Sequence, residues 1–197
     1  MFDIWLRQRI DPVLDRIATA AVNAGLSANM LTIAGAVLGL GAAWAISGGQ
    51  FGAGIALIAA NRLCDGLDGA VARRTAPTAW GGYLDSIADY VFYIAVPVWF
   101  AIADADNLWP ILLLVSSYVL TAVSFLALAA ILSGRDMGHG QKSFTYTSGL
   151  IEGGETIAAY LMMCLLPQHV AVIATLLAVL CLITVLQRLW FARRMLA

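Results

Sequence analysis

Charge is scarce in this chain of 197 residues. Aspartate, glutamate, lysine and arginine together make up 12% of the sequence, whereas 61% of the residues are hydrophobic. A soluble globular domain carries about 25% charged residues. The composition therefore argues against a soluble protein and favours an integral membrane protein. Nothing in the charge pattern indicates nucleic-acid binding, and no internal repeat is evident.

Cysteine is also rare. Cys64, Cys164 and Cys181 lie far apart in apolar segments. Their spacing excludes a disulfide framework and does not match a zinc motif. We expect them to be small buried hydrophobic residues.

An uninterrupted apolar core is missing from the first 25 residues, which argues against a signal peptide. Charged residues there alternate with apolar ones at roughly helical spacing, and Pro12 introduces a break. We interpret residues 1–25 as an amphipathic juxtamembrane helix on the membrane surface. Residues 26–197 are predicted to form one membrane domain.

Long apolar segments fill that domain. About 20 apolar residues in a helix are needed to cross a bilayer. The predicted fold class is all-α, with six transmembrane helices at residues 29–47, 52–72, 82–103, 108–133, 148–166 and 170–190.

The basic residues support this number of spans. The loops 47–50, 104–107 and 167–169 contain no lysine or arginine. Apart from Arg62, which lies within the second span, every basic residue precedes the first span, lies at the C-terminal end of the chain, or lies in one of the other two loops. Because cytoplasmic loops are enriched in lysine and arginine, both termini are predicted to be cytoplasmic.

Four aspartates interrupt the apolar pattern at the predicted cytoplasmic ends of the second and third spans: Asp65, Asp68, Asp85 and Asp89. Helical residues three or four apart share a face, so each pair projects together and the two pairs can face each other. Four ionised carboxylates need cations between them. Oxygen ligands favour hard ions such as Mg²⁺ or Mn²⁺, and a two-metal site suits phosphoryl chemistry.

Residues around the aspartates indicate a diphosphate site. Gly66 and Gly69 lie in a helical segment, where glycine costs about 1 kcal/mol relative to alanine, which we interpret as room for a ligand. Arg73 follows Gly69 by one turn, and its guanidinium suits a phosphate oxygen. Arg62 shares a face with Asp65, as an internal counter-ion or as a ligand contact.

This segment resembles the signature of the CDP-alcohol phosphotransferase family, DxxDGxxARx₈GxxxDxxxD. Its positions are occupied in order by Asp65, Asp68, Gly69, Ala72, Arg73, Gly81, Asp85 and Asp89. Seven residues rather than eight separate Arg73 from Gly81. The segment at 27–32 also resembles the family's first span.

The resemblance implies a reaction in which an acceptor hydroxyl attacks the β-phosphorus of a CDP-alcohol, usually CDP-diacylglycerol, and CMP leaves. It implies that the four aspartates hold two ions of Mg²⁺ or Mn²⁺, and that Asp89 is also the candidate general base. It implies that Gly69 and Arg73 contact the CDP-alcohol, and that the enzyme is a homodimer in the membrane lipid.

Further polar residues are candidates for binding either substrate. Asn29 and Thr32 either contact the nucleotide or act as an ordinary helix cap and a threonine bonded to its own helix. Arg135 and Lys142 either bind a phosphate on the acceptor, for which glycerol 3-phosphate is the default candidate, or form a solvated loop. Glu152 and Glu155 either line an acceptor pocket or complement a helix N-terminus.

Two other functions fit an acidic membrane protein. A divalent-cation transporter would use the aspartates as an ion path, but the four lie at one membrane face and no repeated half is present. A UbiA-type prenyltransferase also carries aspartate-rich motifs, but that fold has about nine spans. We therefore expect the transferase, and CMP release separates it from both alternatives.

Overall fold

The computed structural model describes residues 14–134 and 153–196, and over these ranges the chain is helical with no strand. Residues 14–23 form a first helix. The elements that follow are α2 (Ala28–Ser47), α3 (Phe51–Thr75), α4 (Ala79–Ala103), the short 3₁₀ helix η1 (Ala105–Asn107), α5 (Leu108–Gly134), α6 (Gly153–Leu165), the short 3₁₀ helix η2 (Pro167–His169) and α7 (Val170–Leu196). The predicted all-α class is confirmed over the described residues.

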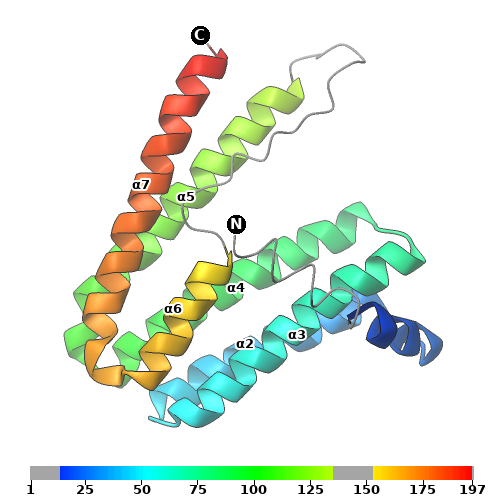
Figure 1. Ribbon diagram of the computed structural model, residues 1–197, viewed down its shortest axis with the longest axis horizontal. Coiled ribbons are helices and arrows are strands. Elements are labelled where there is room, and N and C mark those ends of the chain that lie inside the picture. Colours follow the sequence, from blue (N-terminus) through cyan, green and yellow to red (C-terminus); the bar gives the residue numbers. More distant parts are fainter. Residues whose placement is uncertain (1–13, 135–152, 197) are drawn as a thin grey trace.

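Two groups of helices make up the molecule. Helices α2, α3 and α4 pack together, and α5 packs along α7 (Figure 1). Contacts of α4 with α5, and of α6 with both α3 and α7, join the groups. A shared core contains Ile58, Phe92, Tyr160 and Met163, none of which is exposed to solvent.

Within residues 14–134 and 153–196, four helical segments are long and apolar enough to cross a membrane: Ala28–Ser47, Ala79–Ala103, Ala105–Leu132 and Pro167–Leu196. The charges that make the acidic site lower the hydropathy of α3, and α6 is described over only 13 residues. The six predicted spans therefore correspond to six helices, four of which meet the requirements for a span in length and composition.

Close helix packing in the first group depends on two glycines of α2. A Cβ at Gly35 would lie 3.2 Å from Cβ of Cys64, and one at Gly39 would lie 3.0 Å from the Phe92 ring. Small residues of this kind allow helix backbones to approach within a membrane. This approach brings α3 and α4 together on α2 and fixes the position of their aspartates.

The three loops predicted to share one membrane face meet at one end of the structure. Residues from all three, including Gly49, Asp104 and Gln168, line one open hollow. The turn from α3 to α4, which joins the two halves of the acidic motif, is not part of this hollow. This arrangement agrees with a chain that alternates direction at each helix.

The first helix packs on the other end of α3. Leu14 and Ala18 are buried with Leu67 and Val71 of α3. Arg74 forms an ion pair with Asp15 at 2.7 Å. The amphipathic helix predicted at 1–25 falls partly outside the described residues, and its described part lies against the protein.

Candidate functional site

All four aspartates of the motif border one narrow pocket between α2, α3 and α4. Carboxylate oxygens of Asp65, Asp85 and Asp89 lie within 4.8 Å of one another. Asp68 is the buried member, and its Oδ2 accepts a hydrogen bond of 2.6 Å from the hydroxyl of Thr32. This arrangement agrees with the expectation that the Asp65/Asp68 pair faces the Asp85/Asp89 pair. Asp68 differs from the other three aspartates in its hydrogen bond to Thr32.

The chemistry of the three clustered carboxylates fits a divalent metal ion. They offer oxygen ligands only, close enough to share one ion, and oxygen ligands are those that Mg²⁺ and Mn²⁺ prefer. Such an ion offsets the mutual repulsion of the carboxylates. Asp65, Asp85 and Asp89 are thus the residues that would hold a metal, with Asp68 beside them.

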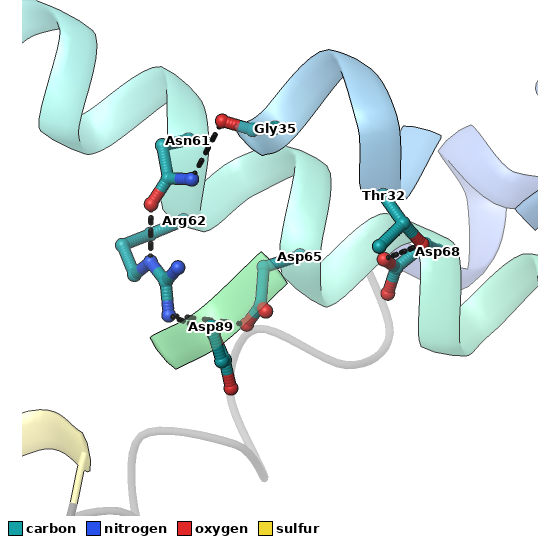
Figure 2. Close-up of polar contacts among 7 residues, drawn as sticks. All are labelled: Thr32, Gly35, Asn61, Arg62, Asp65, Asp68 and Asp89. Atoms are coloured by element: carbon teal, nitrogen blue, oxygen red, sulfur yellow. Dashed lines mark hydrogen bonds and ion pairs between the residues drawn. The ribbon is translucent and has the colours of Figure 1, made fainter. Parts of the chain in front are cut away.

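The positively charged side chain of Arg62 lies at this cluster of carboxylates. Nη1 of Arg62 donates to Oδ1 of Asp89 at 3.1 Å and lies 3.6 Å from Oδ2 of Asp65 (Figure 2). Nε of Arg62 donates to Oδ1 of Asn61 at 2.7 Å, and the Asn61 amide donates to the carbonyl of Gly35 at 2.8 Å. Of the two interpretations open for Arg62, the contacts agree with an internal counter-ion.

An open groove of about 270 Å³ adjoins the acidic pocket. Thr32, Asp68 and Asp85 border both. Asn29 and Gly69, two residues predicted to bind the CDP-alcohol, also line the groove. A ligand in this groove would therefore touch the carboxylates directly.

The glycines near the groove have different surroundings. A Cβ at Gly69 would lie 3.3 Å from Nη1 of Arg73, so the predicted phosphate-binding arginine reaches over this glycine. A Cβ at Gly81 would lie 3.1 Å from Oδ1 of Asn29, so this position holds the start of α4 against α2.

Gly66 corrects one interpretation. Its missing side chain was expected to leave room for a ligand. A Cβ there would lie 2.9 Å from Cδ1 of Leu14, so Gly66 instead admits the first helix. The sequence alone could not separate these roles, because the partner is more than 50 residues away in the chain.

Sequence reasoning missed a second pocket next to the acidic one. Its lining includes Tyr90 and Tyr93, which follow Asp89 on α4, together with residues of α5, α6 and α7. The hydroxyl of the fully buried Tyr160 donates to the carbonyl of Tyr93 at 2.7 Å and lies 3.0 Å from the Tyr118 hydroxyl.

Arg188 lies beside this second pocket. Its Nη1 donates at 2.9 Å to the carbonyl of Thr121, a residue of the pocket lining. Its Nε is buried without a hydrogen-bond partner. The sequence offered little signal for it, because an arginine near the C-terminus also fits a topology determinant.

Of the residues predicted to bind the acceptor, the structure describes only Glu155. Arg135, Lys142 and Glu152 lie outside the described residues. Glu155 stands in the first turn of α6, half-buried, and its neighbours Gly153 and Thr156 line the second pocket. The pairing of the two glutamates therefore stays a prediction.

Comparison with known proteins identifies the family to which this chain is similar. The sequence profile of the CDP-alcohol phosphatidyltransferase family matches residues 25–187. The chain is 37% identical to the inner membrane protein YnjF of Escherichia coli, over 96% of this chain and 94% of that protein. It is 31% identical to an archaetidylinositol phosphate synthase of Pyrococcus horikoshii, over 96% and 95% of the two chains.

Solved structures agree with the sequence comparisons. Phosphatidylinositol phosphate synthase (PgsA1) of Mycobacterium tuberculosis, with CDP-DAG bound, superposes with a TM-score of 0.75 at 26% identity, over 92% of this chain and 94% of that one. The same enzyme in complex with manganese and citrate also gives a TM-score of 0.75, at 25% identity, over 91% and 88% of the two chains.

The helical fold and its acidic pocket thus define a membrane-bound transferase that uses a divalent metal. The chain belongs to the CDP-alcohol phosphatidyltransferase family, because the family profile covers most of its length. It is an integral membrane enzyme of phospholipid biosynthesis, and the family resemblance of its motif is confirmed. The transporter and prenyltransferase alternatives are set aside.

Proposed function

We propose that this enzyme transfers a phosphatidyl group from CDP-diacylglycerol, or from a closely related CDP-alcohol, to a hydroxyl of a phosphorylated polyol. The observation that carries the proposal is the groove that runs into the acidic pocket and shares Thr32, Asp68 and Asp85 with it. A nucleotide diphosphate in the groove would present its phosphates to the carboxylates. The CDP-DAG bound to PgsA1, a structural neighbour over most of the chain, supports this donor class.

Donor binding is assigned to the groove. Asn29 and Gly69 line it, and Arg73 places a fixed positive charge over Gly69. A planar guanidinium pairs well with phosphate oxygens. Asp65, Asp68, Asp85 and Asp89 are proposed to hold two Mg²⁺ or Mn²⁺ ions, which would neutralise the negative charge of the diphosphate during transfer.

The transfer itself needs a base and a leaving group. The acceptor oxygen forms a bond to the β-phosphorus while the bond from that phosphorus to the bridging diphosphate oxygen breaks, and CMP leaves with that oxygen. We assign the proton of the acceptor hydroxyl to a carboxylate oxygen of Asp89, which borders the acidic pocket and directly precedes Tyr90 of the second pocket in α4. A well-placed base contributes about 10²–10⁴-fold to such a step.

The acceptor is proposed to enter from the second pocket. Tyr90 and Tyr93 connect this pocket to Asp89 along α4, and Arg188, which donates to the carbonyl of the lining residue Thr121, supplies a positive charge beside the pocket that suits a phosphate. The relatives named for inositol phosphate products favour an inositol phosphate over glycerol 3-phosphate. Arg135, Lys142, Glu152 and Glu155 stay candidates for further acceptor contacts.

The membrane arrangement completes the proposal. We propose six spans, with both termini and the acidic site on the cytoplasmic side, and a homodimer. The gathering of three loops free of basic residues at one end supports the alternating topology. Single cysteines placed at Gly49 and at Arg74 in a cysteine-free background should label from opposite sides of the membrane. Labelling from the same side would contradict the topology.

The reaction is tested with purified enzyme in detergent. CDP-diacylglycerol and Mn²⁺ or Mg²⁺ are supplied with inositol phosphate, glycerol 3-phosphate, inositol or serine singly, and CMP release is measured. We expect release with inositol phosphate, its loss on chelation with EDTA, and its return when the metal is restored. Release with glycerol 3-phosphate alone would change the acceptor, and no release with any acceptor would overturn the proposed donor.

A further inference from the structure

The structure places a permanent cation inside the acidic cluster. Nη1 of Arg62 lies 3.1 Å from Asp89 Oδ1 and 3.6 Å from Asp65 Oδ2, so it bridges two of the three carboxylates that are close enough to share a metal. Arginine keeps its charge under all physiological conditions. A cation in this position both attracts the two carboxylates and occupies oxygens that a divalent ion would use.

Several contacts hold Arg62 in place. Its Nε is fixed by the Asn61 amide oxygen at 2.7 Å, and Asn61 itself is buried and bonded to the Gly35 carbonyl. Its guanidinium carbon lies 4.4 Å from the centroid of the buried Phe92 ring, within the range of a cation–π contact. The helices α2, α3 and α4 all contribute to this cage. These contacts hold the Arg62 guanidinium in one orientation, whereas the side chains of a surface ion pair would be mobile.

We propose that Arg62 is a positioning residue that aims Asp89 at the acceptor hydroxyl and sets the affinity of the acidic cluster for divalent ions. The effect on Asp89 rests on the proposed function, whereas the effect on metal affinity does not. Because the guanidinium competes for Asp65 and Asp89, its removal strengthens metal binding. Because it also orients Asp89, its removal slows the transfer. A purely structural residue would weaken both properties together when lost.

The test compares three variants of the full-length enzyme. Arg62→Gln removes the charge, Arg62→Lys keeps the charge without the planar fork, and Arg74→Gln removes a charge from the same helix where Arg74 pairs with Asp15. Binding of Mn²⁺ alone is measured from the loss of the free Mn²⁺ signal in electron paramagnetic resonance. CMP release gives kcat and the KM for the CDP-alcohol.

We expect Arg62→Gln to bind Mn²⁺ about tenfold more tightly, since a unit charge within a few ångströms has at least that effect at a protein's effective dielectric. We expect its kcat to fall about 10²-fold with the donor KM unchanged, because Arg62 does not line the donor groove. Arg62→Lys should keep the wild-type Mn²⁺ affinity with a low kcat. Arg74→Gln should match the wild type in both.

Unchanged or weaker Mn²⁺ binding by Arg62→Gln would overturn the proposal, as would an unchanged kcat. The thermal shift caused by Mn²⁺ provides a second measurement, and it should be larger for Arg62→Gln than for the wild type. A smaller shift would contradict the competition. Neither metal measurement needs a substrate, so a wild-type protein that binds Mn²⁺ but releases no CMP would count against the proposed function alone.

Discussion

Residues of one type have different environments within the acidic site. Asp89 faces Arg62 and borders the acidic pocket, whereas Asp68 is buried and bonded to Thr32. Asp65 and Asp85 complete the group of carboxylates around a metal position. Both carboxylates therefore have a hydrogen-bond donor, a charged guanidinium for Asp89 and a neutral hydroxyl for Asp68.

Replacement of Asp89 by asparagine should reduce CMP release about 10²–10⁴-fold, because the amide cannot accept the acceptor proton. The fold should persist, since the side chains have the same shape. Activity and melting temperature are measured together. Asp106→Asn is the matched control, because Asp106 is exposed in η1, outside the acidic pocket. Near-normal turnover of Asp89→Asn would exclude Asp89 as the base.

Replacement of Thr32 by valine should lower the free energy of unfolding by about 1.5–3 kcal/mol, the usual range for a hydrogen bond to a charged group. The loss would leave the Asp68 carboxylate buried without its 2.6 Å donor. Thr32→Ser keeps the hydroxyl and serves as the control. Thermal unfolding in detergent without metal measures the difference, and equal stability of the two variants would show that the contact contributes little.

Helix packing controls the site at the next scale. Helix α2 supports α3 through Gly35 and α4 through Gly39, and the same contacts hold Asn61 and Phe92, which position Arg62. The site therefore depends on how closely three helices approach, although only α3 and α4 carry its aspartates.

Gly39→Val should destabilise the protein by about 1–3 kcal/mol, because a Cβ at this position would lie 3.0 Å from the Phe92 ring and 3.3 Å from the Asn61 amide nitrogen. Displacement of these two side chains should also reduce activity. The control lies two residues further along the same helix, at Gly41, where a Cβ would meet only Cδ1 of Leu57, at 3.8 Å. If Gly39→Val and Gly41→Val were equally stable, the packing argument would be wrong.

Many large apolar side chains are exposed on the described part of the molecule. Val119, near the middle of the segment Ala105–Leu132, is 53% exposed, and Trp109 is 78% exposed. In a soluble protein so much exposed apolar surface would promote aggregation. In an integral membrane enzyme the same surface contacts lipid.

Val119→Arg should reduce membrane integration, because a central arginine costs about 2.5–3.5 kcal/mol on insertion scales. Val119→Leu should integrate normally. The fraction of each variant that resists carbonate extraction from membranes gives the comparison. An equal fraction for both would indicate that Val119 does not face lipid.

The sequence by itself determined the class of fold, the family and the acidic motif. Apolar segments of about 20 residues predict membrane helices directly, and the spacing of Asp65, Asp68, Asp85 and Asp89 depends only on local helix geometry. These features are local in the chain, which is why they could be predicted. The counter-ion role of Arg62 could be proposed from the sequence as one of two interpretations, because Asp65 lies one helical turn away on the same face.

Only the tertiary structure decided which distant residues meet. In the structure Thr32 donates a hydrogen bond to Asp68, and Leu14 packs against Gly66. A second pocket lies next to Asp89 along α4, with Arg188 nearby. Each of these contacts joins segments that are separated by tens of residues, and their packing depends on the shapes of several helices at once. Spacing along one helix carries no information about such contacts, so the sequence could name the reacting residues but not their surroundings.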